Sequence, residues 1–229
     1  MKFEGRTILV TGAAGVVGRA VAANFAAEGA HLVLVDAAAV EPPPVGPGTA
    51  PALCRRADVL DSQALAASLG QVSRIDVLCN IAGGFAMGPR VHETDDAAWA
   101  RMLDSNARTV LSTARVVVPR MLARGEGWIV NVAAGAALRG AAGMGAYAAS
   151  KAAVMRLTES MSAELRDAGI HVNCVLPSII DTPRNRQNMP DADPGRWVRP
   201  EDLAEVIAFL SSPAARAVHG ACIPVTNLS

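Results

Sequence analysis

The sequence of 229 residues has few aromatic residues, few lysines and no excess of either charge. Only 3% of the residues are aromatic, with a single tyrosine, and only two of the 21 basic residues are lysines. A formal net charge of zero gives no basic surface for nucleic acid or an anionic membrane. No uninterrupted apolar run is long enough to span a bilayer, and the first strand-like run starts too early to leave room for a signal peptide. We therefore expect a cytoplasmic protein with no nucleic-acid or membrane partner.

Cysteine and histidine are also scarce, with four of each. Cys54, Cys79, Cys174 and Cys222 stand singly, and three of them fall inside apolar strand-like runs. This pattern favours buried free thiols in a reducing compartment over a disulfide framework. Neither the cysteines nor the dispersed histidines have the spacing of a metal site, so we expect no metal.

Apolar strand-like runs alternate with helical periodicity along the whole chain. Strands are predicted at residues 7–10, 31–36, 53–57, 75–80, 128–132, 171–176 and 221–225, and helices at about 16–28, 62–69, 97–123, 145–167 and 200–210. Pro119 is expected to kink the third helix, and the proline-rich residues 38–51 are expected to form a surface loop. Continuous apolar strands separated by helices are typical of a parallel sheet covered on both faces. The prediction is a single doubly wound α/β domain over residues 1–229, with its ligand at the carboxyl ends of the strands.

A glycine-rich turn follows the first strand and opens the first helix. Gly12, Gly15 and Gly18 permit a tight turn and a close approach of backbone N–H groups to a pyrophosphate, which would face the helix N-terminus. Asp36 ends the second strand, 18 residues after Gly18. A carboxylate there can accept hydrogen bonds from an adenosine ribose and would repel a 2′-phosphate. The spacing therefore predicts a dinucleotide cofactor and favours NAD(H) over NADP(H).

The only tyrosine, Tyr147, stands four residues before Lys151 in a predicted helix. Residues i and i+4 share a helix face, so the phenol and the ammonium are expected to meet. A nearby cation favours the phenolate and brings its pKa, ordinarily about 10, closer to neutrality. The pair is a candidate proton donor and acceptor. The alternative from spacing alone is a core tyrosine beside a snorkelling lysine.

Several motifs in this order resemble the short-chain dehydrogenase/reductase family over essentially the whole chain. The matching segments are the glycine turn at residues 11–18, Asp36, Asp58-Val59, Asn80-Ile81-Ala82-Gly83, Asn106, Tyr147-x-x-x-Lys151 and Asn173-Cys174-Val175-Leu176-Pro177, with Thr182 beyond. The resemblance implies a Rossmann-type fold with a parallel seven-stranded sheet, helices on both faces, and hydride transfer with a nicotinamide cofactor.

The resemblance also implies catalytic roles for three residues. Tyr147 would donate or accept the proton at the substrate. Lys151 would bind the nicotinamide ribose and lower the pKa of Tyr147. Asn106 would shape a helix kink and hold a water in the proton relay.

The cofactor-binding set that the resemblance implies runs through most of the chain. It comprises Gly12, Gly15, Val17, Gly18, Asp36, Asp58, Val59, Asn80, Ala82, Gly83, Tyr147, Lys151, Pro177, Ile180 and Thr182. Asp58 and Val59 would meet the adenine, and residues 80–83 would line the adenosine side. Backbone near Ile180 and the Thr182 hydroxyl would hold the carboxamide.

Two positions depart from the family pattern. The usual glycine turn has glycine at the position of Val16, and a Cβ there restricts the backbone without removing the site. The family's catalytic serine usually lies 13 residues before the tyrosine, at the position of Ala134, and no Ser or Thr occurs between residues 131 and 146. By analogy with oxyanion donors, the missing hydroxyl costs about 10²–10³ in rate. Three explanations stay open: a cofactor binder without catalysis, another donor, or a substrate reactive enough to accept hydride without it.

Several segments also resemble dihydropteridine reductase, a branch of the family that lacks the serine and prefers NADH. They are the Gly-x-x-Gly-x-x-Gly turn and residues 82–84, 136–138, 143–144 and 181–193. A quinonoid dihydropterin is an activated acceptor, so Tyr147 and Lys151 could suffice. In the expected substrate loop, residues 184–197, Met189 and Trp197 could close over a flat ring or simply pack the loop. Against this branch, positions 80, 106 and 149–150 resemble mainstream ketoreductases.

The sequence thus predicts an NAD(P)-dependent oxidoreductase, NADH favoured, acting on a small carbonyl or imine substrate. The alternatives are a quinonoid dihydropteridine reductase and a catalytically weak or inactive NAD-binding protein. From the resemblance alone, we expect a homodimer through the helices that start near residues 97 and 145, or a homotetramer that also uses the last helix and strand. The tail at residues 224–228 departs from the family's usual Asp-Gly-Gly ending at that tetramer contact.

Overall fold

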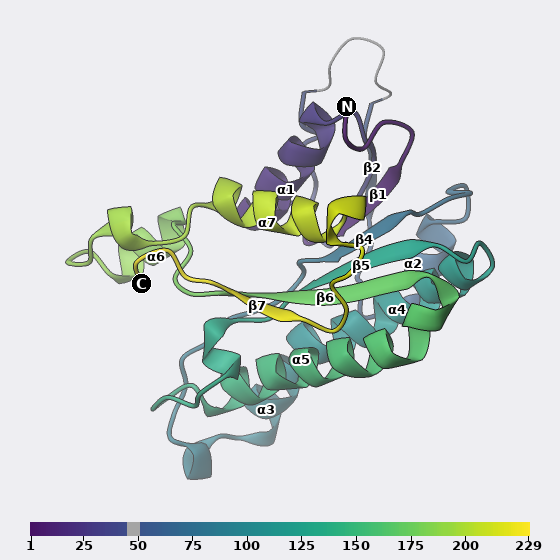
Figure 1. Cartoon of the computed structure of the whole chain (residues 1–229). Helices are drawn as coiled ribbons and strands as arrows, with labels where there is room; N and C mark the ends of the chain where they lie inside the picture. The colour runs from purple at the N-terminus through teal and green to yellow at the C-terminus, as the bar shows by residue number, and fades with distance from the viewer. Residues whose placement is uncertain (45–50) are drawn as a thin grey trace.

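Seven parallel strands form one sheet in the computed structural model of the chain, which describes residues 1–44 and 51–229. The strand order is β3-β2-β1-β4-β5-β6-β7 (Figure 1). The strands are β1 (Thr7–Thr11), β2 (His31–Asp36), β3 (Leu53–Arg56), β4 (Val77–Asn80), β5 (Gly127–Val132), β6 (Ile170–Pro177) and β7 (Cys222–Val225). The predicted parallel sheet is confirmed.

Helices cover both faces of this sheet, as Figure 1 shows. One face carries α1 (Val16–Ala27) and α7 (Pro200–Leu210), which pack against each other. The other face carries α2 (Ser62–Ser68), α4 (Thr109–Leu122) and α5 (Gly145–Leu165), with α3 (Asp96–Leu103) beside α5. This is the doubly wound arrangement that the alternating pattern predicted.

The period-two alternation of the strands divides the core into two apolar layers. In β1, Ile8 and Val10 point into the layer under α1 and α7, whereas Leu9 points into the layer under α2, α4 and α5. All three side chains are fully buried. Strands that are buried on both faces have continuous apolar sequences, which is why these runs predicted a parallel sheet.

The sheet places the candidate site at a change in strand order. β1 lies between β2 and β4 in the sheet. The chain continues from β2 outward to β3, and from β4 in the opposite direction to β5. Ligands of doubly wound sheets bind in the crevice that this reversal opens at the carboxyl ends of the strands. The glycine turn follows β1 at this edge.

The third predicted helix is broken, but not at Pro119. The break is a π-helical segment, Asp104–Arg108, between α3 and α4, and Pro119 lies inside α4 without ending it. The side-chain amide of Asn106 donates to the carbonyl of Met102 one turn earlier (3.2 Å). A side chain that takes a backbone carbonyl disturbs the helical ladder, and this accounts for the break at Asn106.

Two further boundaries differ from expectation. β4 begins at Val77 instead of residue 75, since the Asp76 carboxylate accepts the Thr7 N–H (2.8 Å). The expected loop at residues 184–197 contains the short helix α6 (Pro183–Asn188) and a 3-10 turn (Pro194–Arg196). In the surface loop predicted at 38–51, residues 45–50 lie outside the described residues.

Two further findings concern the described ranges, residues 1–44 and 51–229. No helix in them is long and apolar enough to cross a membrane. No group of three or more His, Cys, Asp or Glu side chains in them could hold a metal ion.

Candidate functional site

The glycine turn after β1 forms a cradle that side chains would fill. Gly12 has a φ of +65°, and a Cβ on it would lie 2.7 Å from the backbone nitrogen of Ala82. A Cβ on Gly18 would overlap the carbonyl of Gly12. Gly15 is the N-cap of α1, in extended backbone, and no side chain caps this helix end. The turn therefore leaves room for a pyrophosphate in front of the α1 N-terminus, where Val16 and Val17 form the first turn of the helix.

Asp36 stands beside this turn at the end of β2. One carboxylate oxygen accepts the N–H of Ala14 (3.0 Å) and the other accepts the N–H of Ala38 (2.9 Å). These bonds fix the carboxylate at the edge of the cradle, where the sequence places the adenosine ribose. Asp58 and Val59 follow the neighbouring strand β3, Asp58 exposed and Val59 buried. The residues predicted for a dinucleotide thus meet at one edge of the sheet, and the cradle fits such a cofactor.

The turn after β4 is tied to β1 by Thr11. The Thr11 hydroxyl accepts the N–H groups of Ile81 (3.1 Å) and Ala82 (3.2 Å). The side chain of Asn80 is engaged inside the protein. Its amide is buried and bonds to Asn131 and Thr113, both at 2.8 Å. Asn80 therefore holds β4, β5 and α4 together, and its side chain is not free to bond a cofactor.

Asn106 connects the π-helical segment to the turn after β4. It is 1% exposed, its amide nitrogen donates to the Gly84 carbonyl (3.0 Å) and its oxygen accepts the Gly84 N–H (3.1 Å). The same nitrogen donates to the Ser150 hydroxyl (3.0 Å), which in turn donates to the Tyr147 carbonyl (2.7 Å). The helix distortion implied for Asn106 is confirmed, and it links α3, α4 and α5.

Lys151 is buried in the same place, with 6% of its surface exposed. Its ammonium donates to the carbonyl of Val132 at the end of β5 (2.9 Å). A Cβ on Gly83 would lie 2.8 Å from the Asn106 side-chain oxygen and 3.2 Å from the Lys151 Nζ. The three groups therefore meet around Gly83, where only a glycine leaves space.

Burial shifts the pKa values of both members of the Tyr147–Lys151 pair. Desolvation lowers the pKa of Lys151 to about 8, with the nearby Cys174 acting in the opposite direction. Desolvation raises the pKa of Tyr147 to about 12. In the cofactor-free protein, burial of the phenol thus outweighs any lowering of its pKa by Lys151, and a lowered pKa in the presence of the cofactor stays a prediction. The lysine donates to Val132 instead.

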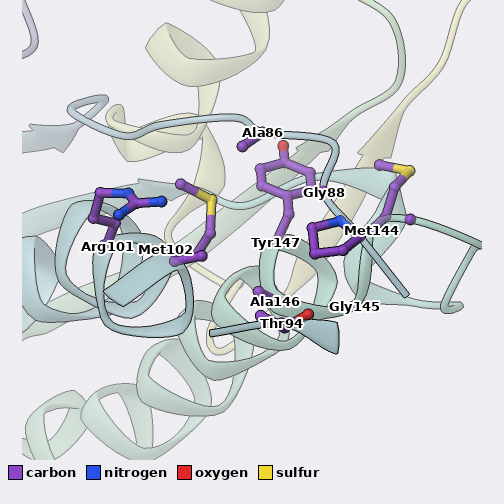
Figure 2. Close-up of a pocket in the computed structure, with 12 residues that line it drawn as sticks. Ala86, Gly88, Thr94, Arg101, Met102, Met144, Gly145, Ala146 and Tyr147 are labelled. Atoms are coloured by element: carbon purple, nitrogen blue, oxygen red, sulfur yellow. The ribbon is translucent and has the colours of Figure 1, made fainter. Parts of the chain in front are cut away.

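Tyr147 projects from the first turn of α5 into a small cavity of about 50 Å³. Figure 2 shows its hydroxyl directed toward the loop that carries Ala86 and Gly88, with Met102 on one side and Met144 on the other. The Phe85 ring meets the Tyr147 ring edge to face, with centroids 4.9 Å apart. Phe85 is a site residue that the motifs miss. It directly follows the matching segment 80–84, and this adjacency is the one signal that could have found it.

Ala134 stands at the start of the 3-10 turn Gly135–Ala137, directly after β5, and is 6% exposed. No hydroxyl-bearing residue occupies that turn or the following segment up to Tyr147. The missing serine hydroxyl at Ala134 therefore lies in the turn after β5, and no neighbouring hydroxyl in this segment replaces it.

Side-chain hydrogen bonds hold the segment after β6 in place. Thr182 caps α6 by accepting the Asn185 N–H (3.1 Å), and the Asn185 side chain donates to the Ile180 carbonyl (2.8 Å). Pro177 is buried at the end of β6. Trp197 is 3% exposed, so it packs this segment and is not available to cover a ring. The predicted carboxamide-binding residues thus lie together, with the Ile180 carbonyl already engaged.

Comparison with known proteins decides the family. The family model described as short chain dehydrogenase matches residues 6–193. The chain belongs to this short-chain dehydrogenase family. A cis-4-hydroxycyclohexanecarboxylate dehydrogenase of Sinomonas cyclohexanicum is 36% identical over 238 residues, which cover 97% of this chain and 96% of the relative. The chain is accordingly an oxidoreductase of a family that is generally NAD(P)-dependent.

Solved structures of the family agree in fold and differ in cofactor. A carveol dehydrogenase from Mycobacterium avium in complex with NAD has 26% identity, a TM-score of 0.86, and coverage of 98% of this chain and 97% of its own. A protein from Beutenbergia cavernae, assigned as an NAD(P)-dependent gluconate 5-dehydrogenase, has NADP bound at low occupancy. It has 31% identity, a TM-score of 0.86, and coverage of 98% and 96%. The seven-stranded fold is thus the one shared by this family.

Proposed function

We propose that this short-chain dehydrogenase interconverts a secondary alcohol and a ketone, with Tyr147 as the proton donor and acceptor. The observation that carries the proposal is a set of buried polar groups around Tyr147. Asn106 bonds to Ser150, which donates to the Tyr147 carbonyl, and the ammonium of Lys151 donates to the Val132 carbonyl. Burying an ammonium costs free energy of folding. Ionisable groups with shifted pKa values cluster at functional sites, so this buried ammonium indicates one. The group lies at the edge of the sheet where the glycine cradle lies, as transfer to a bound cofactor requires.

NAD(H) is the preferred cofactor in this proposal, and it supplies or accepts the hydride when bound. Asp36 supports the preference, because its carboxylate is fixed beside the cradle by two backbone N–H groups and would repel a 2′-phosphate. The glycine turn would hold the pyrophosphate, Asp58 and Val59 the adenine, and Pro177, Ile180 and Thr182 the carboxamide. Lys151 would bind the nicotinamide ribose, and residues 82–83 would line the cofactor through their backbone.

The substrate in this proposal is apolar and contains a ring. Phe85, Met87 and Leu138 are exposed by 43%, 67% and 61%. The Phe85 ring contacts Tyr147, Met87 lies on the same loop as Phe85, and Leu138 lies on the segment that precedes Tyr147. A flexible thioether and an aromatic ring suit a flat or cyclic hydrocarbon better than a polyol. Two of the family members described above act, by name, on carveol and on a hydroxycyclohexanecarboxylate. Both names denote ring-containing alcohols, which supports a ring in the substrate; the second is a carboxylate and does not bear on its apolar character.

The first test measures NADH and NADPH oxidation with a series of cyclic and linear ketones. We expect turnover of cyclic ketones with NADH, and a loss of about 10²–10⁴ in kcat for Tyr147→Phe while NADH binding is retained. Phe85→Ala serves as the matched substrate-side variant, and it should raise KM for cyclic ketones more than for linear ones. Equal activity of wild type and Tyr147→Phe would refute the proposed role of the tyrosine.

Because Ala134 carries no hydroxyl, two other functions are alternatives to this proposal. A dihydropteridine reductase or a cofactor-binding protein without turnover would not need that hydroxyl. Ala134→Ser separates the cases, because a restored donor should raise kcat on an unactivated ketone by about 10²-fold, as oxyanion donors do. A pterin reductase would reduce quinonoid dihydropterin without gaining from the serine. A protein without turnover would bind NADH and show no activity in either form.

We also propose that residues 1–229 act as one catalytic domain in the cytoplasm, and that two copies associate through α4 and α5. All four cysteines are free thiols, which suits a reducing compartment. A groove of about 380 Å³ runs between α4 and α5, and its lining includes Leu111, Val118 and Leu157. Leu111 is 40% exposed in the single chain. A second copy would cover this apolar groove.

A further inference from the structure

Two cysteines lie side by side on the last two strands of the sheet. Cys174 of β6 and Cys222 of β7 are in-register partners. Both side chains point to the same face, because Cys174 belongs to the apolar layer under α5 and Cys222 packs against that layer. Neighbouring strands lie about 4.8 Å apart, within the Cα separation of about 4.4–6.8 Å that a disulfide accepts. The backbone therefore permits a bond between these two thiols.

The pair connects solvent with the group around Lys151. Cys222 is half-buried and lies near Glu159 and Arg156 of α5. Cys174 is fully buried and lies near Lys151 and near Ala133, whose N–H donates to the Val175 carbonyl (3.0 Å). Ala133 directly precedes Ala134, at the place where the family's serine would stand. One thiol of the pair is thus open to solvent, and the other lies directly behind the site.

The two thiols differ in how readily they ionise. The Cys174 thiol donates to the Val175 carbonyl (3.5 Å). The adjacent Cys174 lowers the pKa of Cys222, with burial acting in the opposite direction, whereas the adjacent Cys222 and burial raise the pKa of Cys174. Cys222 therefore becomes the thiolate first, and it is also the thiol that a reagent in water can reach.

We propose that Cys222 and Cys174 form a peroxide-sensitive pair that closes a disulfide between β6 and β7. The Cys222 thiolate attacks hydrogen peroxide and takes one oxygen, giving a sulfenic acid and releasing hydroxide. The Cys174 thiol then attacks the sulfenic sulfur, the S–S bond forms, and water leaves with the Cys174 proton. The cysteines together lose two electrons, and the peroxide is reduced to one water and one hydroxide, which becomes a second water with the proton that Cys222 released on ionising.

The disulfide affects the site because it moves the Cys174 sulfur. Bonding to Cys222 draws this sulfur toward β7 and away from Ala133 and the surroundings of Lys151. Buried packing is dense, so a displaced sulfur directly behind a catalytic group changes its position. Oxidation should therefore lower the reductase activity reversibly. This consequence rests on the proposed function, whereas formation of the disulfide does not.

The experiment treats the reduced protein with hydrogen peroxide, alkylates the remaining thiols and maps the tryptic peptides. Cys174 falls in the peptide 167–184 and Cys222 in 217–229, while Cys54 and Cys79 fall in other peptides. We expect these two peptides to be linked, with a mass about 2 Da below their sum, and to separate with dithiothreitol. NADH-dependent activity should fall by about tenfold on oxidation and return on reduction.

Cys222→Ser and Cys54→Ser provide the matched comparison. Cys222→Ser should neither form the link nor lose activity reversibly, whereas Cys54→Ser, which removes the other half-buried thiol, should behave as wild type. A Cys222 that is overoxidised without linking to Cys174 would overturn the proposal, and so would equal inhibition of wild type and Cys222→Ser. Linked peptides in a protein without reductase activity would uphold the disulfide and refute the proposed function alone.

Discussion

At the scale of single residues, the ammonium of Lys151 is the most costly feature of the site. It is 6% exposed and its one hydrogen-bond acceptor in the described residues is the Val132 carbonyl. Burial lowers its pKa from 10.5 to about 8. The folded protein therefore binds fewer protons than the unfolded chain between these values. Stability is lost as pH falls from about 10.5 through about 8, and the full cost is present at pH 7.

Lys151→Met should consequently stabilise the cofactor-free protein at pH 7 while abolishing activity. The expected gain in the free energy of unfolding is of the order of ~3 kcal/mol, which is what the lowered pKa represents. Urea unfolding at pH 7 and pH 10 measures it, and the gain should shrink at the higher pH. Lys2→Met is the matched control, since Lys2 is exposed and is the only other lysine. A less stable Lys151→Met protein would show that the lysine supports the fold.

Gly83→Ala tests how closely the group around Lys151 is packed. The added Cβ would lie 2.8 Å from the Asn106 oxygen and 3.2 Å from the Lys151 Nζ, and both would have to shift. A misplacement of this size commonly costs about 10²-fold in rate, so kcat/KM should fall by that order. Gly140→Ala is the control, because a Cβ there meets nothing within 4 Å. Full activity of Gly83→Ala would mean that the group tolerates displacement.

Site residues were predictable from sequence where a short motif fixes them. Tyr147 and Lys151 sit on one helix four residues apart, so their neighbourhood is local. Asn80 shows the limit of such motifs. Its segment matches the family pattern, yet its side-chain amide bonds to Asn131 and Thr113 inside the protein. Phe85 shows the converse, since its contact with Tyr147 joins residues 62 positions apart and no spacing indicates it.

At the scale of elements, the starts of β1, β5 and β6 carry a stack that no motif predicted. The Arg6 guanidinium lies 4.5 Å from the Trp128 ring centroid. Trp128 stacks on His171 at 5.4 Å, and His171 stacks on His219 at 4.4 Å. Within the described residues, Arg6 Nη1, Trp128 Nε1 and His171 Nδ1 are buried without a hydrogen-bond partner. The stack thus replaces hydrogen bonds with ring contacts at the edge of the sheet opposite the site.

This stack makes the protein sensitive to acid. Burial lowers the pKa of His171, and the neighbouring His219 lowers it further. Because the folded pKa lies below the unfolded value of about 6.5, stability is lost as pH falls from about 6.5 through the folded pKa. His171→Phe should keep the stacked ring and flatten this decline. Thermal melts between pH 7.5 and 5 measure it, with exposed His31→Gln as the control, and an unchanged decline would exclude His171 as the cause.

The break in the third predicted helix shows why element boundaries resist prediction. Proline is a strong local signal, so Pro119 was the expected kink, yet α4 continues through it. The actual break follows from Asn106, whose amide joins Met102, Gly84 and Ser150. Two of these partners belong to other elements. Tertiary hydrogen bonds therefore decided the boundary, and local propensity could not reveal them.

At the scale of the whole molecule, the fold was predictable because every level of the sequence agreed. Strands such as β1, apolar on both faces, the glycine turn and the alternation with helices all require the same parallel sheet. The substrate was not predictable, since it depends on the exposed Phe85, Met87 and Leu138 in loops with no fixed spacing. The oligomeric state was not predictable either, because a sequence pattern indicates an apolar surface patch but not what covers it.

Assembly is nevertheless testable, because the two expected contacts lie on different helices. Leu111 on α4 and Phe209 on α7 are each 40% exposed, in the groove beside α5 and on the opposite layer respectively. Leu111→Glu should dissociate the dimer, since a charge in an apolar contact is costly to bury. Its activity should fall as well, because α5, which carries Tyr147, forms the other wall of that groove.

Phe209→Glu separates the dimer from the tetramer. If the protein is a tetramer, this variant should sediment as a dimer with activity retained, whereas Leu111→Glu should sediment as a monomer or a differently paired dimer with reduced activity. Sedimentation velocity at several protein concentrations distinguishes these species. An unchanged sedimentation coefficient for Leu111→Glu would refute association through α4 and α5. A wild-type dimer that Phe209→Glu leaves unchanged would mean that the tetramer contact is missing. The tail at residues 224–228 would then explain its loss, because the family's Asp-Gly-Gly ending is absent there.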